Sequence, residues 1–237
     1  MKKGDLRKQE ILQTAEKLFC RKGYEQTSVQ DILDQLKTSK GSFYHHFVSK
    51  ESVLETLCSK RAEQSRDDIL NQTEGYPTAA ARLNQLLTGM IPFHDEKLSF
   101  ILMLLPTFIL PEGRSVKTSY CESLRNAFHP SVSDTIREGI LSGEFVCGDA
   151  DIGADLVIST VNRLWVSVCD IIIGNESEGK DTDLAELLHL TEQYRTASER
   201  MLSAVYGSLV LIDIPLLKGL VDQIHVHWNT NQTDHTI

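Results

Sequence analysis

Apolar residues recur at spacings of three and four along most of the chain, a pattern typical of amphipathic helices. Residues 2–22 form the first such stretch, and Gly23 after it is suited to end a helix. The second stretch, 28–36, follows Thr27, which we expect to cap this helix in a capping box with Gln30. No run alternates Val or Ile with polar residues as a strand does, so the predicted fold class is all-α.

A short helix is predicted after the turn at 37–38. Phe43 and Phe47 lie four residues apart and share one face. The opposite face carries Thr38, Gly41, Ser42 and His45. Glycine costs about 1 kcal/mol against alanine in a helix, but it lets the backbone approach another surface. Hydroxyl groups, Lys40 and Tyr44 suit phosphate oxygens, whereas Ser42 and His45 could reach base edges. Taken alone, the segment is equally consistent with an ordinary amphipathic helix that packs an aromatic stripe on a core.

The surrounding elements favour DNA binding. A helix, a capped second helix, a short turn and a one-sided third helix make a helix-turn-helix unit. A fourth helix, capped by Ser49, is expected over 50–72. We therefore predict a DNA-binding domain at 5–65, with the motif at about 28–47. The charge agrees: residues 1–61 hold 12 basic and 8 acidic side chains, net +4, although the whole chain carries −9.

Residues 5–61 resemble the DNA-binding domain of the TetR family of transcriptional repressors. The string Ser39-Lys-Gly-Ser-Phe-Tyr-His-His-Phe47, followed by Ser49-Lys-Glu51, carries this resemblance most specifically. The resemblance implies phosphate contacts for Thr27, Ser28, Lys37, Tyr44, His46 and Lys50. It places Thr38, Ser39, Lys40, Ser42 and His45 nearest the base edges, with Gly41 allowing close approach. Tyr44 could instead cover the core edge, and His46 could be a packed histidine.

Two positions depart from the family pattern. Leu36 and Lys37 stand where the family often has a small residue and glycine. A non-glycine residue at positive φ there would cost of order 1 kcal/mol, which Lys37 could offset by reaching a phosphate. Thr38 replaces the usual branched apolar residue of the turn.

The rest of the chain reads as a second helical domain at 75–228, followed by a polar, disordered tail at 229–237. Pro130 is expected to bend the chain between two helical stretches. A short last helix should end near Val226. Predicted helices 150–173 and 184–209 are the longest. The first is apolar nearly all round, so it must be covered on two sides. The resemblance implies that these two helices form a homodimer interface; the alternative is that both are buried within a larger monomer.

The resemblance also implies a pocket for a small-molecule effector in this bundle. Candidate lining residues are large or aromatic, with few polar anchors, so an apolar or aromatic effector is expected. They are Phe93, Phe100, Met103, Phe108, Tyr120, Phe128, Asn162 and Trp165, with Arg163 as a further anchor. For each of these residues a place in the plain core is the simpler interpretation.

No nucleophile elbow, phosphate loop, zinc helix or dinucleotide glycine pattern occurs, so we expect no enzyme activity, cofactor or metal site. The five single cysteines and the lack of a secretory signal indicate a reducing cytoplasm. Neither apolar run, 98–111 or 156–173, is a convincing membrane span. The predicted function is a homodimeric repressor of a palindromic DNA operator, released by an effector through helix 50–72. The alternative is an all-α ligand-binding or protein-interaction module that no longer binds DNA.

Overall fold

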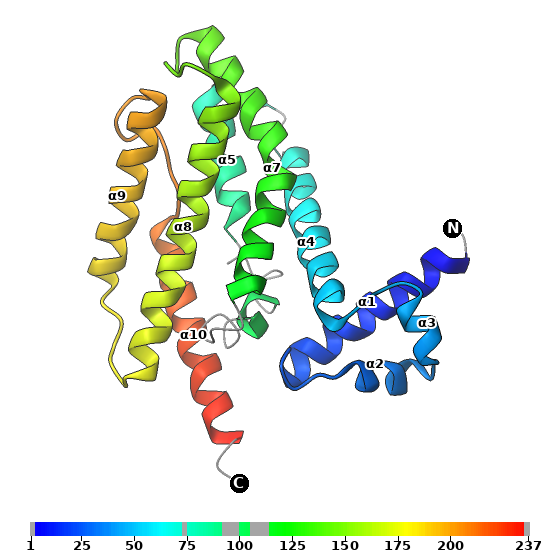
Figure 1. Ribbon diagram of the computed structural model, residues 1–237. Coiled ribbons are helices and arrows are strands. Elements are labelled where there is room, and N and C mark those ends of the chain that lie inside the picture. The colour runs from blue at the N-terminus through cyan, green and yellow to red at the C-terminus, as the bar shows by residue number, and fades with distance from the viewer. Residues whose placement is uncertain (1–2, 73–74, 92–99, 105–113, 235–237) are drawn as a thin grey trace. The chain divides into compact units, whose positions relative to one another are not determined.

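The computed structural model describes residues 3–72, 75–91, 100–104 and 114–234. Every regular element within these ranges is a helix, which confirms the predicted all-α class (Figure 1). The chain divides into a head unit, residues 1–61 and 95–123, and a body unit, residues 62–94 and 124–237. This division differs from the predicted domains, because residues 95–123 group with the head.

Four helices build the N-terminal part of the head unit: α1 (Lys3–Lys22), α2 (Val29–Leu36), α3 (Lys40–Tyr44) and the first part of α4 (Lys50–Gln72). The apolar faces of these helices form one core. Its buried side chains include Ile11, Ala15, Leu18, Phe19, Ile32, Leu33, Phe43, Phe47, Val53, Leu54 and Leu57. The helical periodicity of the sequence therefore identified this core correctly.

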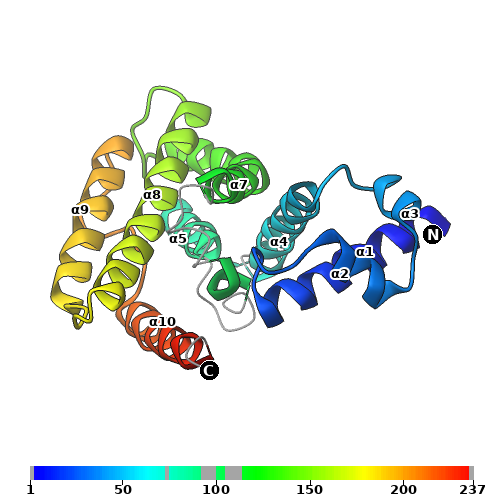
Figure 2. The same cartoon turned by 60° about the horizontal axis from the view of Figure 1, so that its bottom comes forward.

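The body unit contains the end of α4, α5 (Ala79–Met90), the second part of α7 (Arg114–Ser142), α8 (Ala150–Ser177), α9 (Leu184–Leu202) and α10 (Ile214–Asp234). Helix α8 contacts α5, α9 and α10, and it lies between α9 and α5 in both ribbon views (Figures 1 and 2). These neighbours explain why α8 is apolar on most sides. By length and composition α8 could cross a membrane, but 61% of its most apolar 18-residue stretch is buried inside the protein.

Several helix boundaries differ from the prediction; α8, for example, continues to Ser177 instead of ending at 173. Helix α7 continues through Pro130, and Phe128 and Val132 on either side of it are fully buried, so packing of this stretch accompanies the continuous helix. Helix α9 ends at Leu202 instead of 209, where Ser203 takes a left-handed conformation. Residues 203–213 then form a non-helical segment, which we call the strap.

Helix α10 is longer than predicted and continues to Asp234, so residues 229–234 are helical and not a disordered tail. Polar contacts hold its outer part. His225 Nδ1 lies 2.8 Å from Glu176 Oε1 of α8, and Asn229 Nδ2 lies 3.0 Å from His225 Nε2 one turn back. Residues 235–237 of the predicted tail lie outside the described residues.

Candidate nucleic-acid interface

The cap of α2 differs from the prediction by one residue. Ser28 is the N-cap: its Oγ accepts from Asp31 N at 3.2 Å, and the Asp31 carboxylate accepts from Ser28 N at 2.7 Å. Thr27 is only 1% exposed, and its hydroxyl donates to the Gly23 carbonyl at 2.8 Å. Thr27 therefore has a structural role in place of the predicted phosphate contact, because its donor is used inside the head. Ser28 is exposed and stays a predicted contact.

Asp31 joins α2 to α1. Its carboxylate accepts from Lys22 Nζ at 2.8 Å and from the Ser28 hydroxyl at 2.6 Å. The Lys22 hydrogen bond, followed by those from Ser28, holds the pKa of Asp31 well below its usual range. The Asp31 carboxylate and the Lys22 ammonium thus neutralise each other beside Ser28.

The turn between α2 and α3 uses a lysine where glycine would be unstrained. Lys37 has φ 50° and ψ 48°, and its N–H bonds to the Asp34 and Leu33 carbonyls at the end of α2. The Thr38 N–H bonds to the Leu33 carbonyl at 3.0 Å, completing a left-handed helix ending. The predicted positive φ is therefore present. Its consequence is that the Lys37 side chain is exposed next to α3.

Helix α3 presents two different faces. Phe43 is fully buried and Phe47 is 3% exposed, with their ring centroids 6.0 Å apart. Ser39 caps the helix, its Oγ accepting from Ser42 N at 3.3 Å. The predicted DNA-facing residues lie on the other side and are exposed or half-buried: Thr38, Ser39, Lys40, Gly41, Ser42 and His45. The aromatic stripe and the polar face are thus both real, as the sequence pattern indicated.

No packing constraint inside the described structure accounts for Gly41. A Cβ added there would meet only Ser39 Oγ, at 4.0 Å, and Gly41 is absent from the residues with positive φ. Alanine would thus fit and would favour the helix. The glycine is therefore useful only to a surface that approaches from outside.

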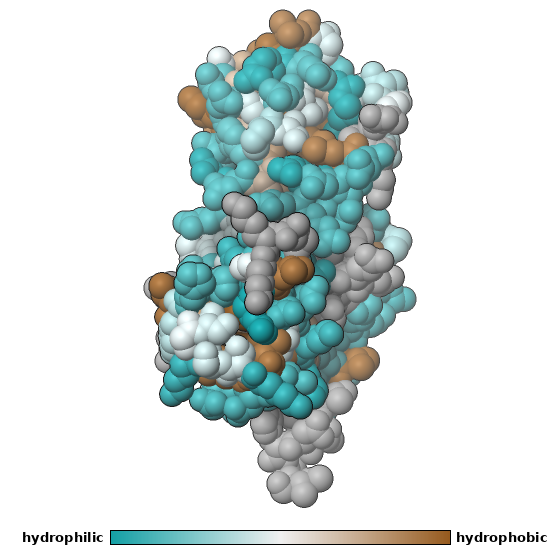
Figure 3. Space-filling model, turned by 90° about the vertical axis from the view of Figure 1, so that its right-hand side faces the viewer, coloured by the Kyte–Doolittle hydropathy of each residue, from teal (hydrophilic) through white to brown (hydrophobic). Residues whose placement is uncertain are grey.

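Three ring side chains lie at the C-terminal end of α3, those of Tyr44, His45 and His46. Tyr44 is 53% exposed, with its ring edge-on to buried Phe43 at 5.4 Å. The His45 and His46 rings lie 4.8 Å apart, and His46 is half-buried. Figure 3, which views the molecule from the side of α3, shows a mostly hydrophilic surface with separate hydrophobic spots. A polar surface of this kind is better suited to bind an anionic partner than an apolar partner.

Lys50 is held internally. Its Nζ donates to the Tyr24 carbonyl at 2.9 Å and lies 4.1 Å from the centroid of the Tyr24 ring. The hydrogen bond uses one of the three ammonium donors, so the phosphate contact of the Lys50 side chain stays a prediction. The next helix is capped as predicted by Ser49, whose Oγ accepts from Ser52 N at 3.2 Å.

The described residues among those predicted to line an effector pocket are divided between the two units. Phe93 and Phe108 lie outside the described residues. Phe100, Met103 and Tyr120 are buried in the head unit, whereas Phe128, Asn162 and Trp165 are buried in the body unit. Asn162 Oδ1 accepts from Trp165 Nε1 at 3.1 Å. Arg163 is exposed, so it is not an anchor inside the bundle.

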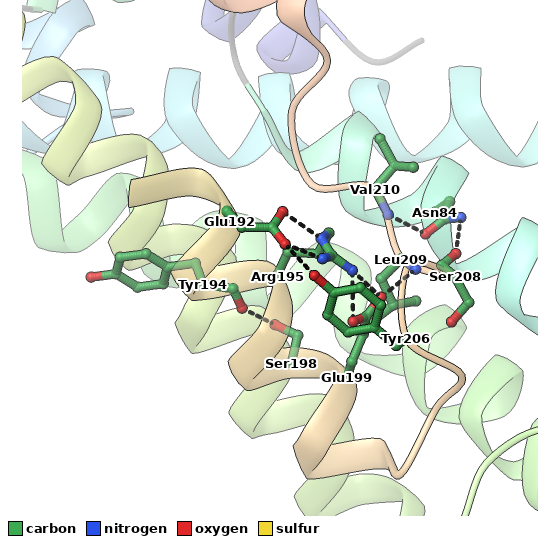
Figure 4. A network of polar contacts seen from close by, with 10 residues as sticks. All are labelled: Asn84, Glu192, Tyr194, Arg195, Ser198, Glu199, Tyr206, Ser208, Leu209 and Val210. Carbon is green, nitrogen blue, oxygen red and sulfur yellow. Dashed lines mark hydrogen bonds and ion pairs between the residues drawn. The ribbon is translucent and has the colours of Figure 1, made fainter. Parts of the chain in front are cut away.

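A cavity of about 350 Å³ does occur in the body unit, at the end of α9. It is lined by Thr196, Glu199, Arg200, Ser203, Ala204 and Tyr206, a more polar set than predicted. A polar network beside it holds the strap (Figure 4). Arg195 binds Glu199 at 2.6 Å and also pairs with Glu192, while Glu199 accepts from Leu209 N at 3.0 Å.

Asn84 of α5 holds the strap from the other side. Its Oδ1 accepts from Val210 N at 2.9 Å, and its Nδ2 donates to the Ser208 carbonyl at 2.9 Å (Figure 4). One side-chain amide thus pairs with the extended backbone as a neighbouring strand would. These bonds satisfy backbone groups next to Leu209 and Leu211 of the strap, which are each buried at 1% exposure.

Metal and thiol chemistry find little support among the described residues. No group of three His, Cys, Asp or Glu side chains there could hold a metal ion. Burial raises the pKa of the Cys58 and Cys121 thiols to about 12, so both stay protonated at neutral pH.

Comparison with known proteins agrees with this geometry. Residues 11–57, which span α1 to α4, match the family described as bacterial regulatory proteins, tetR family. This part of the chain is a TetR-type DNA-binding domain. The chain is 34% identical over 114 residues to the HTH-type transcriptional regulator YerO of Bacillus subtilis, a match that covers 47% of this chain and only 39% of that relative.

Longer matches are weaker. The chain is 26% identical over 196 residues to the HTH-type transcriptional repressor AcnR of Corynebacterium diphtheriae, covering 82% of this chain and 94% of the relative. The fold resembles the fatty acid degradation regulator FadR of Bacillus halodurans, with a TM-score of 0.53 at 18% identity over 87% of this chain and 99% of that one. The TetR-type head is thus its most recognisable part.

The sequence did not identify some residues with a clear structural role. Asn84 and Glu199 hold the strap through Ser208 and Leu209, respectively. Asn84 and Ser208 are more than a hundred positions apart in the sequence. The start of α1 also borders α3, because Gly4 lies near His46 and the Lys8 ammonium lies over the Phe47 ring. Only the excess of basic residues near the N-terminus pointed to that region beforehand.

Proposed function

We propose that this protein is a TetR-family DNA-binding transcriptional regulator, a repressor that acts in the cytoplasm on a palindromic operator. One observation carries the proposal: the exposed polar face of α3 lies over buried Phe43 and Phe47 and includes a glycine with open space above it. The names of the relatives, which are HTH-type regulators and repressors, support the same function.

The residues divide by chemistry. Ser28, Lys37, Tyr44 and His46 are the proposed phosphate contacts, since they surround α3 and remain accessible. Thr38, Ser39, Lys40, Ser42 and His45 are proposed to lie nearest the base edges. Gly41 lets the helix backbone approach the groove. The burial and internal hydrogen bond of Thr27 remove its side chain from the proposed interface, whereas Lys50 stays a proposed phosphate contact.

A homodimer would supply the second half of the grip. A helix of five residues is a weak binder alone, whereas two copies related by a two-fold axis read half-sites in successive major grooves. Helices α8 and α9 are the proposed interface. Ile152 and Leu156 of α8 are 60% and 49% exposed.

The second proposed helix, α9, has its own incompletely covered apolar stripe. Leu190, Tyr194 and Met201, spaced four and seven residues apart, are half-buried, and Ala197 between them is exposed. In Figure 4 the Tyr194 side chain points away from the strap network. A second copy could cover this stripe together with the exposed start of α8.

An effector would act through contacts within the head unit. The Arg61 guanidinium of α4 lies 5.6 Å from the centroid of the Phe100 ring, and it donates to Glu16 of α1 at 2.9 and 2.6 Å. Phe100 in turn lies 6.3 Å from the Tyr120 ring. An apolar ligand that displaced Phe100 would therefore disturb the link between α4 and α1. The size of this effect is limited by the difference between the ligand's affinities for the DNA-binding state and the released state of the protein.

Selection of bound sequences from random duplex DNA tests the proposal. We expect an inverted repeat, enriched by a protein whose dimeric state has been confirmed by ultracentrifugation. The selected duplex then serves as a probe for compounds that release it. A folded dimer that enriches no sequence at low salt contradicts the proposal.

The alternative is a ligand-binding or protein-interaction module that has lost DNA binding. The body unit is where it finds support, because a cavity of about 350 Å³ lies there at the end of α9. The two functions differ in one measurement. A module without DNA binding would elute from a heparin column at the same salt concentration whether or not Lys37 and Lys40 are replaced by glutamine.

A further inference from the structure

The first turns of α1 lie beside the C-terminal end of α3. A Cβ built on Gly4 would stand 3.9 Å from Cε1 of His46, so the first turn of α1 lies close to this imidazole. Lys8, one turn further along α1, has its Nζ 5.7 Å from the centroid of the Phe47 ring. Positions 4 and 8 share one face of the helix. Both ribbon views show the N-terminal end of α1 next to α3 (Figures 1 and 2).

The Lys8 ammonium is available to an outside anion. Lys8 is exposed, and no described carboxylate pairs with it. Its neighbour Arg7 is different, because its guanidinium binds Glu10 at 2.8 Å. The Phe47 ring holds the Lys8 side chain close to the turn that carries His45 and His46. A lysine partly ordered in this way loses less conformational freedom when it meets a phosphate.

We propose that Lys8 binds a DNA backbone phosphate beyond the stretch of groove that α3 reads, so that the start of α1 forms a second contact in each half-site. This proposal rests on the proposed function. The chemistry is that of a point charge on a phosphodiester, which carries no base preference. The contact therefore adds affinity and salt dependence, and it lengthens the protected backbone on one side of the recognition helix.

The chain offers a matched control for Lys8. Lys17 is an exposed lysine on the same helix, nine residues on, which is about 13 Å along the axis and on the opposite side. Replacing either lysine with glutamine removes one positive charge from α1. Long-range electrostatics would change equally in both variants, whereas a direct phosphate contact would be lost only in Lys8→Gln.

The experiment measures the dissociation constant of the selected duplex between 50 and 200 mM salt for the parent dimer and its variants. Each lost phosphate contact lowers the slope of log affinity against log salt by about 0.9. In a dimer Lys8→Gln removes two contacts, so we expect a decrease of about 2, alike on the best site and on mismatched sites. Lys8→Arg should keep the parent slope, and Lys17→Gln should match the parent.

Lys40→Gln separates this proposal from the proposed function. If Lys40→Gln weakens binding while folded Lys8→Gln has the parent slope, the α1 contact is refuted and DNA binding by α3 stands. If Lys8→Gln and Lys17→Gln lower the slope equally, the effect is general charge and the contact is likewise refuted. A parent that selects no DNA overturns both proposals. Thermal unfolding of each variant shows that the head remains folded.

Discussion

Gly41→Ala adds one methyl group to the face of α3 that is proposed to meet DNA. Within the chain the new Cβ would meet only Ser39 Oγ, at 4.0 Å, which is ordinary van der Waals contact. Replacing a helical glycine with alanine at a compatible position stabilises a protein by about 0.4–1 kcal/mol. We therefore expect Gly41→Ala to unfold at the parent temperature or a few degrees higher.

DNA binding should respond in the opposite direction. If the backbone at Gly41 packs against the duplex, the methyl group overfills a close contact, and overpacking costs typically about 1–3 kcal/mol. At 1.4 kcal/mol for each factor of ten, this corresponds to an increase in the dissociation constant of about 5- to 150-fold per half-site. The variant would thus be more stable and less able to bind.

Fluorescence anisotropy with the selected duplex, at one salt concentration, measures the binding change. Gly219→Ala in α10 is the matched control, because a Cβ there meets nothing within 4 Å and the position lies outside the head unit. It should gain similar stability and keep the parent affinity. If Gly41→Ala is folded and binds DNA like the parent, then DNA does not approach the backbone at this position.

Other substitutions test single contacts. Lys37→Gly should remove left-handed strain of about 1 kcal/mol and raise the unfolding temperature, yet weaken DNA binding and lower its salt slope. Thr27→Val should lose the buried bond to Gly23, costing about 1 kcal/mol in urea unfolding, with DNA affinity unchanged. Asn84→Leu should cost about 1–3 kcal/mol in the same assay by orphaning the strap backbone; a neutral effect would contradict the clamp. The lowered pKa of Asp31 means that its stabilisation is present above the unfolded pKa of about 3.9 and is lost as pH falls through the lower folded value. The melting-temperature difference between Asp31→Asn and the parent should therefore stay constant from about pH 5 to 7 and shrink only below about pH 4.

Short-range features of the head were predictable because they depend on local spacing. The two faces of α3 follow from Phe43 and Phe47 at helical spacing, and Gly23 ends α1 as expected, with φ 87°. The cap of α2 was misplaced by one residue, since Thr27 and Ser28 are both good caps in sequence. What separates them is the buried position of Thr27, which no local pattern encodes.

The predicted pocket illustrates the opposite case. An aromatic residue in a helix marks a buried position, but it does not specify which of two cores receives it. Phe100 and Tyr120 are in the head unit and Phe128 is in the body unit, although α7 carries both Tyr120 and Phe128. Helical periodicity identifies the inward face of each helix and says nothing about which unit that face joins.

The sequence alone determined that the chain is all-α, where most helices lie, and that a polar face with a glycine covers an aromatic stripe near residue 41. These features rest on spacings of three and four residues and on caps next to the helix they end. Only the tertiary structure decided that Lys50 binds Tyr24, that Lys8 lies over Phe47 and that Asn84 holds the strap. These partners are 26, 39 and 124 residues apart, and such contacts depend on how whole helices pack against one another.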